Sequence, residues 1–126
     1  MKLPLMKTRA CLALAEETET ARRDLYALLD RFPAESFTSG NVETEDNVRG
    51  ILCHVTFATF SYGCWIDRVL GRLDPAVEKG RKAEFLARVR AITNARDYST
   101  ASEWASETYY NALAATSEPE LDLEFK

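Results

Sequence analysis

Hydrophobic residues recur along the chain at spacings of three and four, the pattern of helices that bury one face. This periodicity predicts helices at about residues 8–31, 45–70, 76–95 and 100–115, with a tail at 116–126. The connections between them are short, and no segment makes a convincing strand. We therefore expect residues 1–126 to form a single all-α domain, an up-down helical bundle.

The first predicted helix has an apolar stripe on one side and charged residues on the other. Because a charged helix face usually contacts water, the glutamates are interpreted as a solvated surface. The stripe consists of Leu14, Ala21, Leu25, Leu28 and Phe32, and the charged side of Glu16, Glu17, Glu19, Arg22 and Arg23.

The second predicted helix is the most hydrophobic, and residues 51–65 contain no Asp, Glu, Lys or Arg. Two neighbouring apolar stripes run along it, so we expect it to be the deeply buried central helix of the domain. The first stripe is Val48, Ile51 or Leu52, Val55, Ala58 or Thr59, Tyr62, Ile66 and Val69. The second is Cys53, Phe57, Phe60 and Cys64.

The predicted helix ends rest on capping residues. Thr44 is the expected N-cap of the second helix, and Pro75 suits the first turn of a third helix with a solvated outer face. The T-x-x-E sequence from Thr100 to Glu103 resembles a capping box that starts the fourth helix. Pro119 is expected to stop any helix, and residues 121–125 alternate as a strand would.

Composition excludes several classes of protein. The formal net charge is −4 and there is no basic stripe, so we expect no nucleic-acid binding. The N-terminus is a poor signal peptide and residues 51–65 are too short to span a membrane, which favours a cytoplasmic protein without membrane attachment. Three cysteines at irregular spacing, Cys11, Cys53 and Cys64, are expected to be buried free thiols.

His54 is the only histidine in the chain and the only residue here that suggests a metal site. A lone histidine beside an apolar face is usually structural, with one hydrogen bond. If His54 is functional, binding of zinc or nickel is its most economical role. Any further ligands from this chain have to be Asp, Glu or Cys. Gly50, one turn earlier, either leaves space beside the imidazole or lets a neighbouring helix approach.

The segment VRGILCHVTFATFSYGCWIDRVLGR resembles the second helix of the DinB-like family (DinB/YfiT-like metalloenzymes). The matching features are His54, Tyr62, Trp65, Ile66 and the Leu70-Gly71 end. The later segment ARDYSTASEWASETYYNALAATSEPELD resembles another part of such bundles, so the resemblance covers about residues 8–120. The resemblance implies a four-helix bundle that is often homodimeric and has a metal-dependent hydrolase or thiol-transferase-like activity. The family name refers to a stress response, which concerns expression and not a DNA-binding activity.

In that family the metal is held by one histidine on the second helix and an H-x-x-x-H pair on the last helix. His54 would be the first ligand, and the pair has no counterpart in this chain. The last helix is thus missing or replaced by a partner, and we expect a divalent metal to bind weakly or not at all. A bundle without its last helix exposes an apolar groove, so we also expect a homodimer. The groove candidates are Val55, Phe57, Tyr62, Trp65, Trp104 and Tyr109.

Three interpretations follow from the sequence. The protein is a DinB-like protein with an incomplete metal triad, or a non-enzymatic helical dimerisation module in which His54 is structural, or an enzyme fragment that needs a further helix. The pattern does not specify a catalytic residue or a small-molecule substrate.

Overall fold

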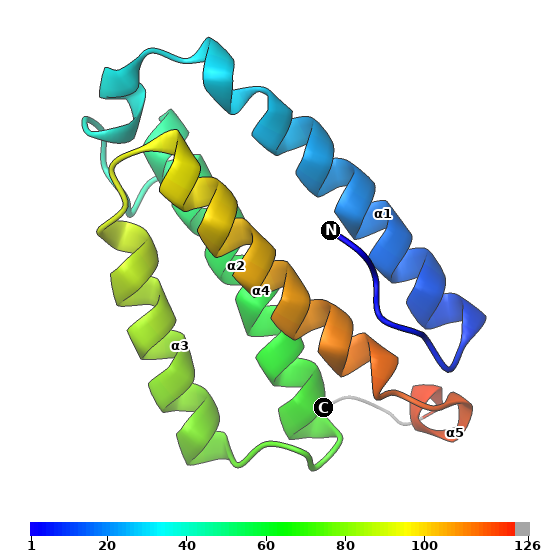
Figure 1. The fold of residues 1–126 in the computed structure, drawn as a ribbon. Helices are drawn as coiled ribbons and strands as arrows, with labels where there is room; N and C mark the ends of the chain where they lie inside the picture. The colour runs from blue at the N-terminus through cyan, green and yellow to red at the C-terminus, as the bar shows by residue number, and fades with distance from the viewer. Residues whose placement is uncertain (123–126) are drawn as a thin grey trace.

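The computed structural model describes residues 1–122, and its regular elements are all helical. Four long helices alternate in direction, as Figure 1 shows, which confirms the predicted all-α up-down bundle. They are α1 (Arg9–Ala27), α2 (Val48–Val69), α3 (Pro75–Arg90) and α4 (Ala95–Ala114). The short elements are the 3-10 helices η1 (Leu29–Arg31) and η2 (Ala34–Phe37), and α5 (Glu118–Leu121).

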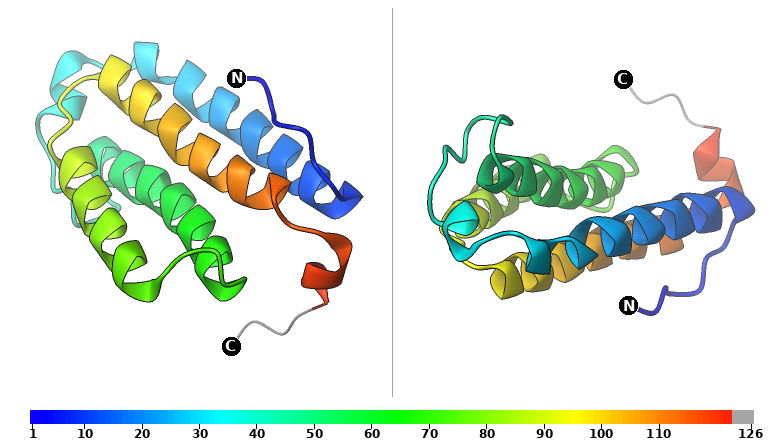
Figure 2. Two further views of the ribbon diagram at one scale, coloured as in Figure 1. Left: turned by 60° about the horizontal axis from the view of Figure 1, so that its bottom comes forward. Right: turned by 90° about the horizontal axis from the view of Figure 1, so that it is seen from above.

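The helices form two layers, with α1 and α4 in one and α2 and α3 in the other (Figure 2). The helix α4 packs against both α1 and α2, and α3 covers the far side of α2. The helix α1 packs along α4 rather than along α2. The space between α1 and α2 is consequently open on one side of the molecule.

The two central helices approach closely at Gly63. A Cβ atom at this position would lie 2.9 Å from the backbone of Thr108 and Tyr109, so the α2–α4 contact requires the missing side chain. Close backbone approach of this kind is a common use of glycine.

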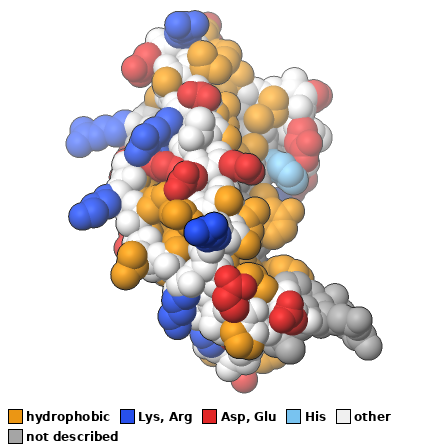
Figure 3. All heavy atoms as spheres, turned by 90° about the vertical axis from the view of Figure 1, so that its right-hand side faces the viewer, with side chains coloured by type: hydrophobic (Ala, Val, Ile, Leu, Met, Phe, Trp, Pro, Cys, Tyr) orange, Lys and Arg blue, Asp and Glu red, His pale blue; other side chains and the backbone are white. Residues whose placement is uncertain are grey.

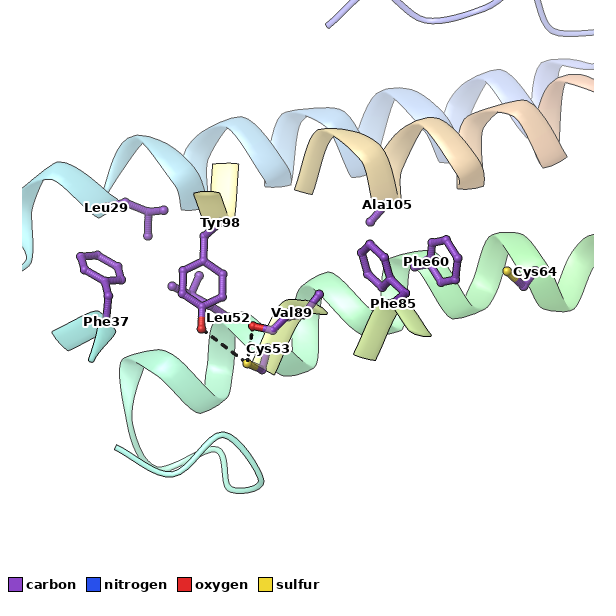
Figure 4. Packing of buried hydrophobic residues seen from close by; sticks show 10 residues of the cluster. All are labelled: Leu29, Phe37, Leu52, Cys53, Phe60, Cys64, Phe85, Val89, Tyr98 and Ala105. Atoms are coloured by element: carbon purple, nitrogen blue, oxygen red, sulfur yellow. Dashed lines mark hydrogen bonds between the residues drawn. The ribbon is translucent and has the colours of Figure 1, made fainter. Parts of the chain in front are cut away.

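The hydrophobic core lies between α2, α3 and α4 and continues under η2 (Figure 4). Phe60 stacks on Phe85 with ring centroids 4.1 Å apart. Cys53 donates to the carbonyl of Val89 at 3.6 Å and lies 3.4 Å from the hydroxyl of Tyr98. All three cysteines are free and buried, as predicted.

Several predicted helix ends are wrong, because asparagines compete as caps. Asn47 rather than Thr44 caps α2, since its side chain accepts from the N–H of Gly50 at 2.8 Å. Asn94 caps α4, so this helix starts at Ala95 and the predicted capping box at Thr100 lies inside it. The helix α3 accordingly ends at Arg90, before residue 95.

The ends of the first helix and of the tail also differ from the prediction. The helix α1 stops at Ala27, and residues 29–31 form the separate 3-10 turn η1. Pro119 lies in the first turn of α5, where a proline without an N–H is tolerated, so it does not stop this helix. Leu121 is helical, and residues 123–125 of the predicted alternation lie outside the described residues.

The buried faces of α1 and α2 are rotated from those predicted. In α1 the buried line is Cys11, Ala15 and Glu19, whereas Leu14 is exposed, as are Leu28 and Phe32 beyond the end of this helix. In α2 the second predicted stripe is buried at Cys53, Phe60 and Cys64, but Ile51, Val55 and Tyr62 of the first stripe are exposed. The physical reason is that α1 does not cover α2, so this helix is central but buried on one side only.

Candidate functional site

His54 lies at the molecular surface, although it belongs to the helix that the sequence predicts to be deeply buried. The side chain is 61% exposed, and Nδ1 lies 3.1 Å from Oε1 of the equally exposed Glu45. Figure 3 shows the imidazole in pale blue beside acidic side chains. It borders a shallow hollow of about 170 Å³ between α2, α3 and the loop before α2. His54 is thus not packed in the hydrophobic core, as a structural histidine would be.

Gly50 serves neither of the two purposes that its position suggested. The loop before α2 crosses directly over it, and a Cβ atom here would overlap the carbonyl oxygen of Thr44. The close passage of this loop, rather than of a helix, brings Glu45 to His54.

The residues around His54 do not fit the metal implied by the family resemblance. A catalytic zinc site usually has three protein ligands, and His54 with Glu45 supplies two. The next carboxylate, Glu43, lies 3.9 Å from the guanidinium of Arg90, which brings a positive charge to the same hollow. Within residues 1–122 no three His, Cys, Asp or Glu side chains are grouped closely enough to hold a metal ion.

We expect His54→Ala to change the free energy of unfolding by less than about 0.5 kcal/mol, because an exposed contact between an imidazole and a carboxylate contributes little. Urea denaturation of both proteins at pH 7 measures the difference. A loss above about 2 kcal/mol would show that the imidazole has partners beyond Glu45.

A groove runs between α1 and α2, with α4 as its floor, and we call it the α1–α2 groove. One hollow in it, about 130 Å³, lies where the hydroxyls of Tyr26 and Thr56 meet at 2.7 Å. A second hollow of about 300 Å³ follows towards α5 and has entirely apolar walls. The second hollow is lined by Cys11, Leu14, Tyr62, Trp65, Ile66, Leu70, Tyr109, Leu113, Thr116 and Leu121.

The predicted groove residues are divided among several surfaces. Tyr62, Trp65 and Tyr109 line the apolar hollow, and Val55 lines the hollow near Tyr26. The other two lie elsewhere: Phe57 borders the hollow of His54, and Trp104 lies on the opposite side of α2. The apolar groove predicted from the sequence therefore exists with different walls, because α1 supplies one of them.

The exposed side of α2 carries no Asp, Glu, Lys or Arg between residues 51 and 66, and His54 is its one titratable group apart from Tyr62. Its outward line, which we call the α2 stripe, consists of Ile51, Val55, Ala58, Tyr62 and Ile66. Tyr62 is the most exposed at 61%, and Ile51 and Val55 are also open to solvent. By contrast, the exposed sides of α1 and α3 contain several acidic and basic residues. Charged residues are depleted at the centres of protein–protein interfaces. A solvent-facing helix surface without Asp, Glu, Lys or Arg therefore resembles an interface more than the ordinary surface of a monomer.

A buried ionic cluster on α1 was missed from the sequence. Glu19 is 4% exposed and accepts two hydrogen bonds of 2.8 Å from Arg22. Tyr110 of α4 donates to it at 2.9 Å, Arg23 lies at 3.2 Å, and the amino group of Met1 at 3.6 Å. The bonds from Arg22 lower the pKa of Glu19 from 4.5 to about 2, against the opposing effect of burial. Only one feature of the sequence pointed to this cluster. Cys11, Ala15 and Glu19 are four residues apart, so the two small residues and Glu19 share one face of α1.

Comparisons with known proteins give no relative for this chain. No family model, no curated protein and no solved structure matches it. The resemblance to the DinB-like family stays a prediction. None of the helices within residues 1–122 is long and apolar enough to cross a membrane.

Proposed function

We propose that this chain is a non-enzymatic helical interaction module that pairs with a second copy of itself. The α2 stripe and the α1–α2 groove beside it form the interface. The observation that carries the proposal is the exposure of Ile51, Val55 and Tyr62 on a helix surface that has no charge for sixteen residues, 51–66.

The absence of charge favours a second copy over a different partner. A two-fold interface brings the same surface of both chains together, so any charged group near the axis meets its own like charge. The α2 stripe avoids this repulsion entirely. An oppositely charged partner, in turn, would find no complementary group on the stripe.

The dimensions indicate that α2 cannot form the interface alone. Residues 51–66 extend for about 24 Å, and a helix about 10 Å wide presents roughly 240 Å² over that length. A stable dimer buries about 800 Å² on each chain. The α1–α2 groove supplies further apolar surface, including Leu14, which is exposed on α1. The two α2 helices would therefore lie across each other, with Tyr62 of each copy over the groove of the other.

Size-exclusion chromatography with light scattering at micromolar concentration tests this proposal. We expect a species of about twice the chain mass of 14.2 kDa. Tyr62→Glu and Val55→Glu should each raise the dissociation constant more than about tenfold, because each places a carboxylate without a partner against the apolar surface of the other copy.

Val77→Glu is the matched control. Val77 is 45% exposed on α3, away from the α2 stripe, and the substitution changes the net charge by the same amount. This variant should remain dimeric. A wild-type protein that is monomeric at micromolar concentration, or dimer loss in Val77→Glu equal to that in Tyr62→Glu, would contradict the proposal.

A further inference from the structure

A separate hollow lies on the other side of α2, between α2, α3 and α4. It measures about 260 Å³ and is lined by Phe60, Cys64, Arg81, Glu84, Phe85, Arg88, Trp104 and Thr108. Its walls are aromatic: Phe60 stacks on Phe85, and Trp104 meets Phe85 edge to face at 5.9 Å. Trp104 is 46% exposed, so a large indole surface remains accessible beside the hollow.

Two arginines at the rim of this hollow, Arg81 and Arg88, have no anionic partner among the described residues. Glu84 lies three residues after Arg81 and four before Arg88, a spacing that normally allows helical ion pairs. The structure nevertheless gives none of these three side chains an ion pair within residues 1–122. The guanidinium of Arg88 instead lies over the ring of Trp104, 4.4 Å from its centroid. Both guanidiniums therefore keep donors free for an anion.

We propose that this hollow binds a small aromatic monocarboxylate, with the ring against the exposed indole of Trp104 and the carboxylate at Arg81 and Arg88. Aromatic rings favour stacked and edge-to-face packing, and the exposed part of Trp104 offers a surface for it, whereas Phe60 and Phe85 are buried against each other. Guanidinium groups match a carboxylate in shape as well as charge. Two cations against the single charge of Glu84 leave the rim positive overall.

The volume restricts the ligand to one ring. Pockets for drug-sized ligands measure about 300–1,000 Å³, and this hollow lies just below that range at about 260 Å³. A single ring with a short carboxylate arm suits it, whereas a dinucleotide or an extended peptide does not. This inference is independent of dimerisation through the α2 stripe, because the hollow lies on the opposite side of α2.

Phenylacetate is the probe, and the indole N–H signals of the two tryptophans are the readout in heteronuclear magnetic resonance spectra. Trp65→Phe assigns the signals. Trp65 lines the apolar hollow of the α1–α2 groove, so its signal serves as an internal control for non-specific ring binding. We expect phenylacetate to shift the Trp104 signal saturably at millimolar concentration and to leave the Trp65 signal in place. Phenylacetamide and acetate, which lack the charge and the ring respectively, should bind at least about fivefold more weakly.

Two substitutions on the same helix face should act in opposite directions. Arg88→Gln should weaken phenylacetate binding about fivefold, and Glu84→Gln should strengthen it about twofold, because each changes one exposed charge beside the carboxylate. Arg31→Gln, an exposed arginine on η1, should have no effect. Equal binding of phenylacetamide, no saturable shift of Trp104, or the same affinity in Arg88→Gln and Glu84→Gln would overturn the proposal.

Discussion

Glu19→Gln is expected to lower the free energy of unfolding by about 3 kcal/mol at pH 7. The carboxylate is nearly inaccessible to water and holds Arg22, which is itself only 11% exposed. Removing one partner of a buried ion pair leaves the other charge without compensation and costs about 3–5 kcal/mol. Glutamine keeps one acceptor for Arg22 or Tyr110, so we expect the lower end of that range.

The same substitution should change how stability depends on pH. The pKa of Glu19 is lowered to about 2 in the folded protein, chiefly by the hydrogen bonds from Arg22 and also by Tyr110. A carboxyl group with a lowered pKa stabilises the fold fully above its unfolded value, 4.5, and loses this contribution as the pH falls towards 2. The difference between wild type and Glu19→Gln should therefore be constant above about pH 5 and shrink steadily below it.

Urea denaturation from pH 2.5 to 7 measures both quantities, and Glu16→Gln is the control. Glu16 is on the same helix and exposed, so its substitution should have little effect at any pH. A loss in Glu19→Gln that stays the same at pH 3 and pH 7 would contradict the ionic explanation, because a packing defect does not titrate.

The helical fold was predictable because it depends on local patterns. Spacings of three and four identified all four long helices, and the Pro75 helix start was correct to one residue. The faces were less predictable, because they depend on which helices become neighbours. Cys11 and Ala15 are small enough for α4 to pack closely on α1, and this rotates Leu14 outwards. Nothing in the local sequence of α1 indicates that preference.

The candidate sites depended on contacts between distant residues, so sequence reasoning found them only in part. His54 was identified by being unique, but its neighbour Glu45 comes from a loop whose path is set by Gly50 and Asn47. The sequence alone does not distinguish Glu19 from the exposed glutamates of the same helix, because its partner Tyr110 is 91 residues away. The sequence shows directly that residues 51–66 of α2 lack Asp, Glu, Lys and Arg. Such a run indicates burial, but the structure shows that part of this surface faces solvent.

Gly63→Ala is expected to destabilise the protein by about 2 kcal/mol, although alanine is the better helix former. The added Cβ would lie 2.9 Å from three backbone atoms of Thr108 and Tyr109, and backbone atoms cannot rotate away as the end of a side chain can. The helices α2 and α4 would have to separate, which loosens the core that they share with Phe85. Overpacking of this kind costs about 1–3 kcal/mol, which exceeds the gain of up to about 1 kcal/mol from replacing glycine in a helix.

Gly80→Ala separates these two contributions, because Gly80 is also inside a helix, α3. A Cβ atom there would meet no atom within 4 Å apart from the adjoining residues and backbone of its own helix. This substitution should stabilise the protein by up to about 1 kcal/mol through helix propensity alone. Thermal and urea denaturation of the two variants should therefore move in opposite directions from wild type. If both substitutions stabilise the protein, α2 and α4 have room to accept a methyl group at their crossing, and the close approach at Gly63 cannot be what sets the spacing of the two layers.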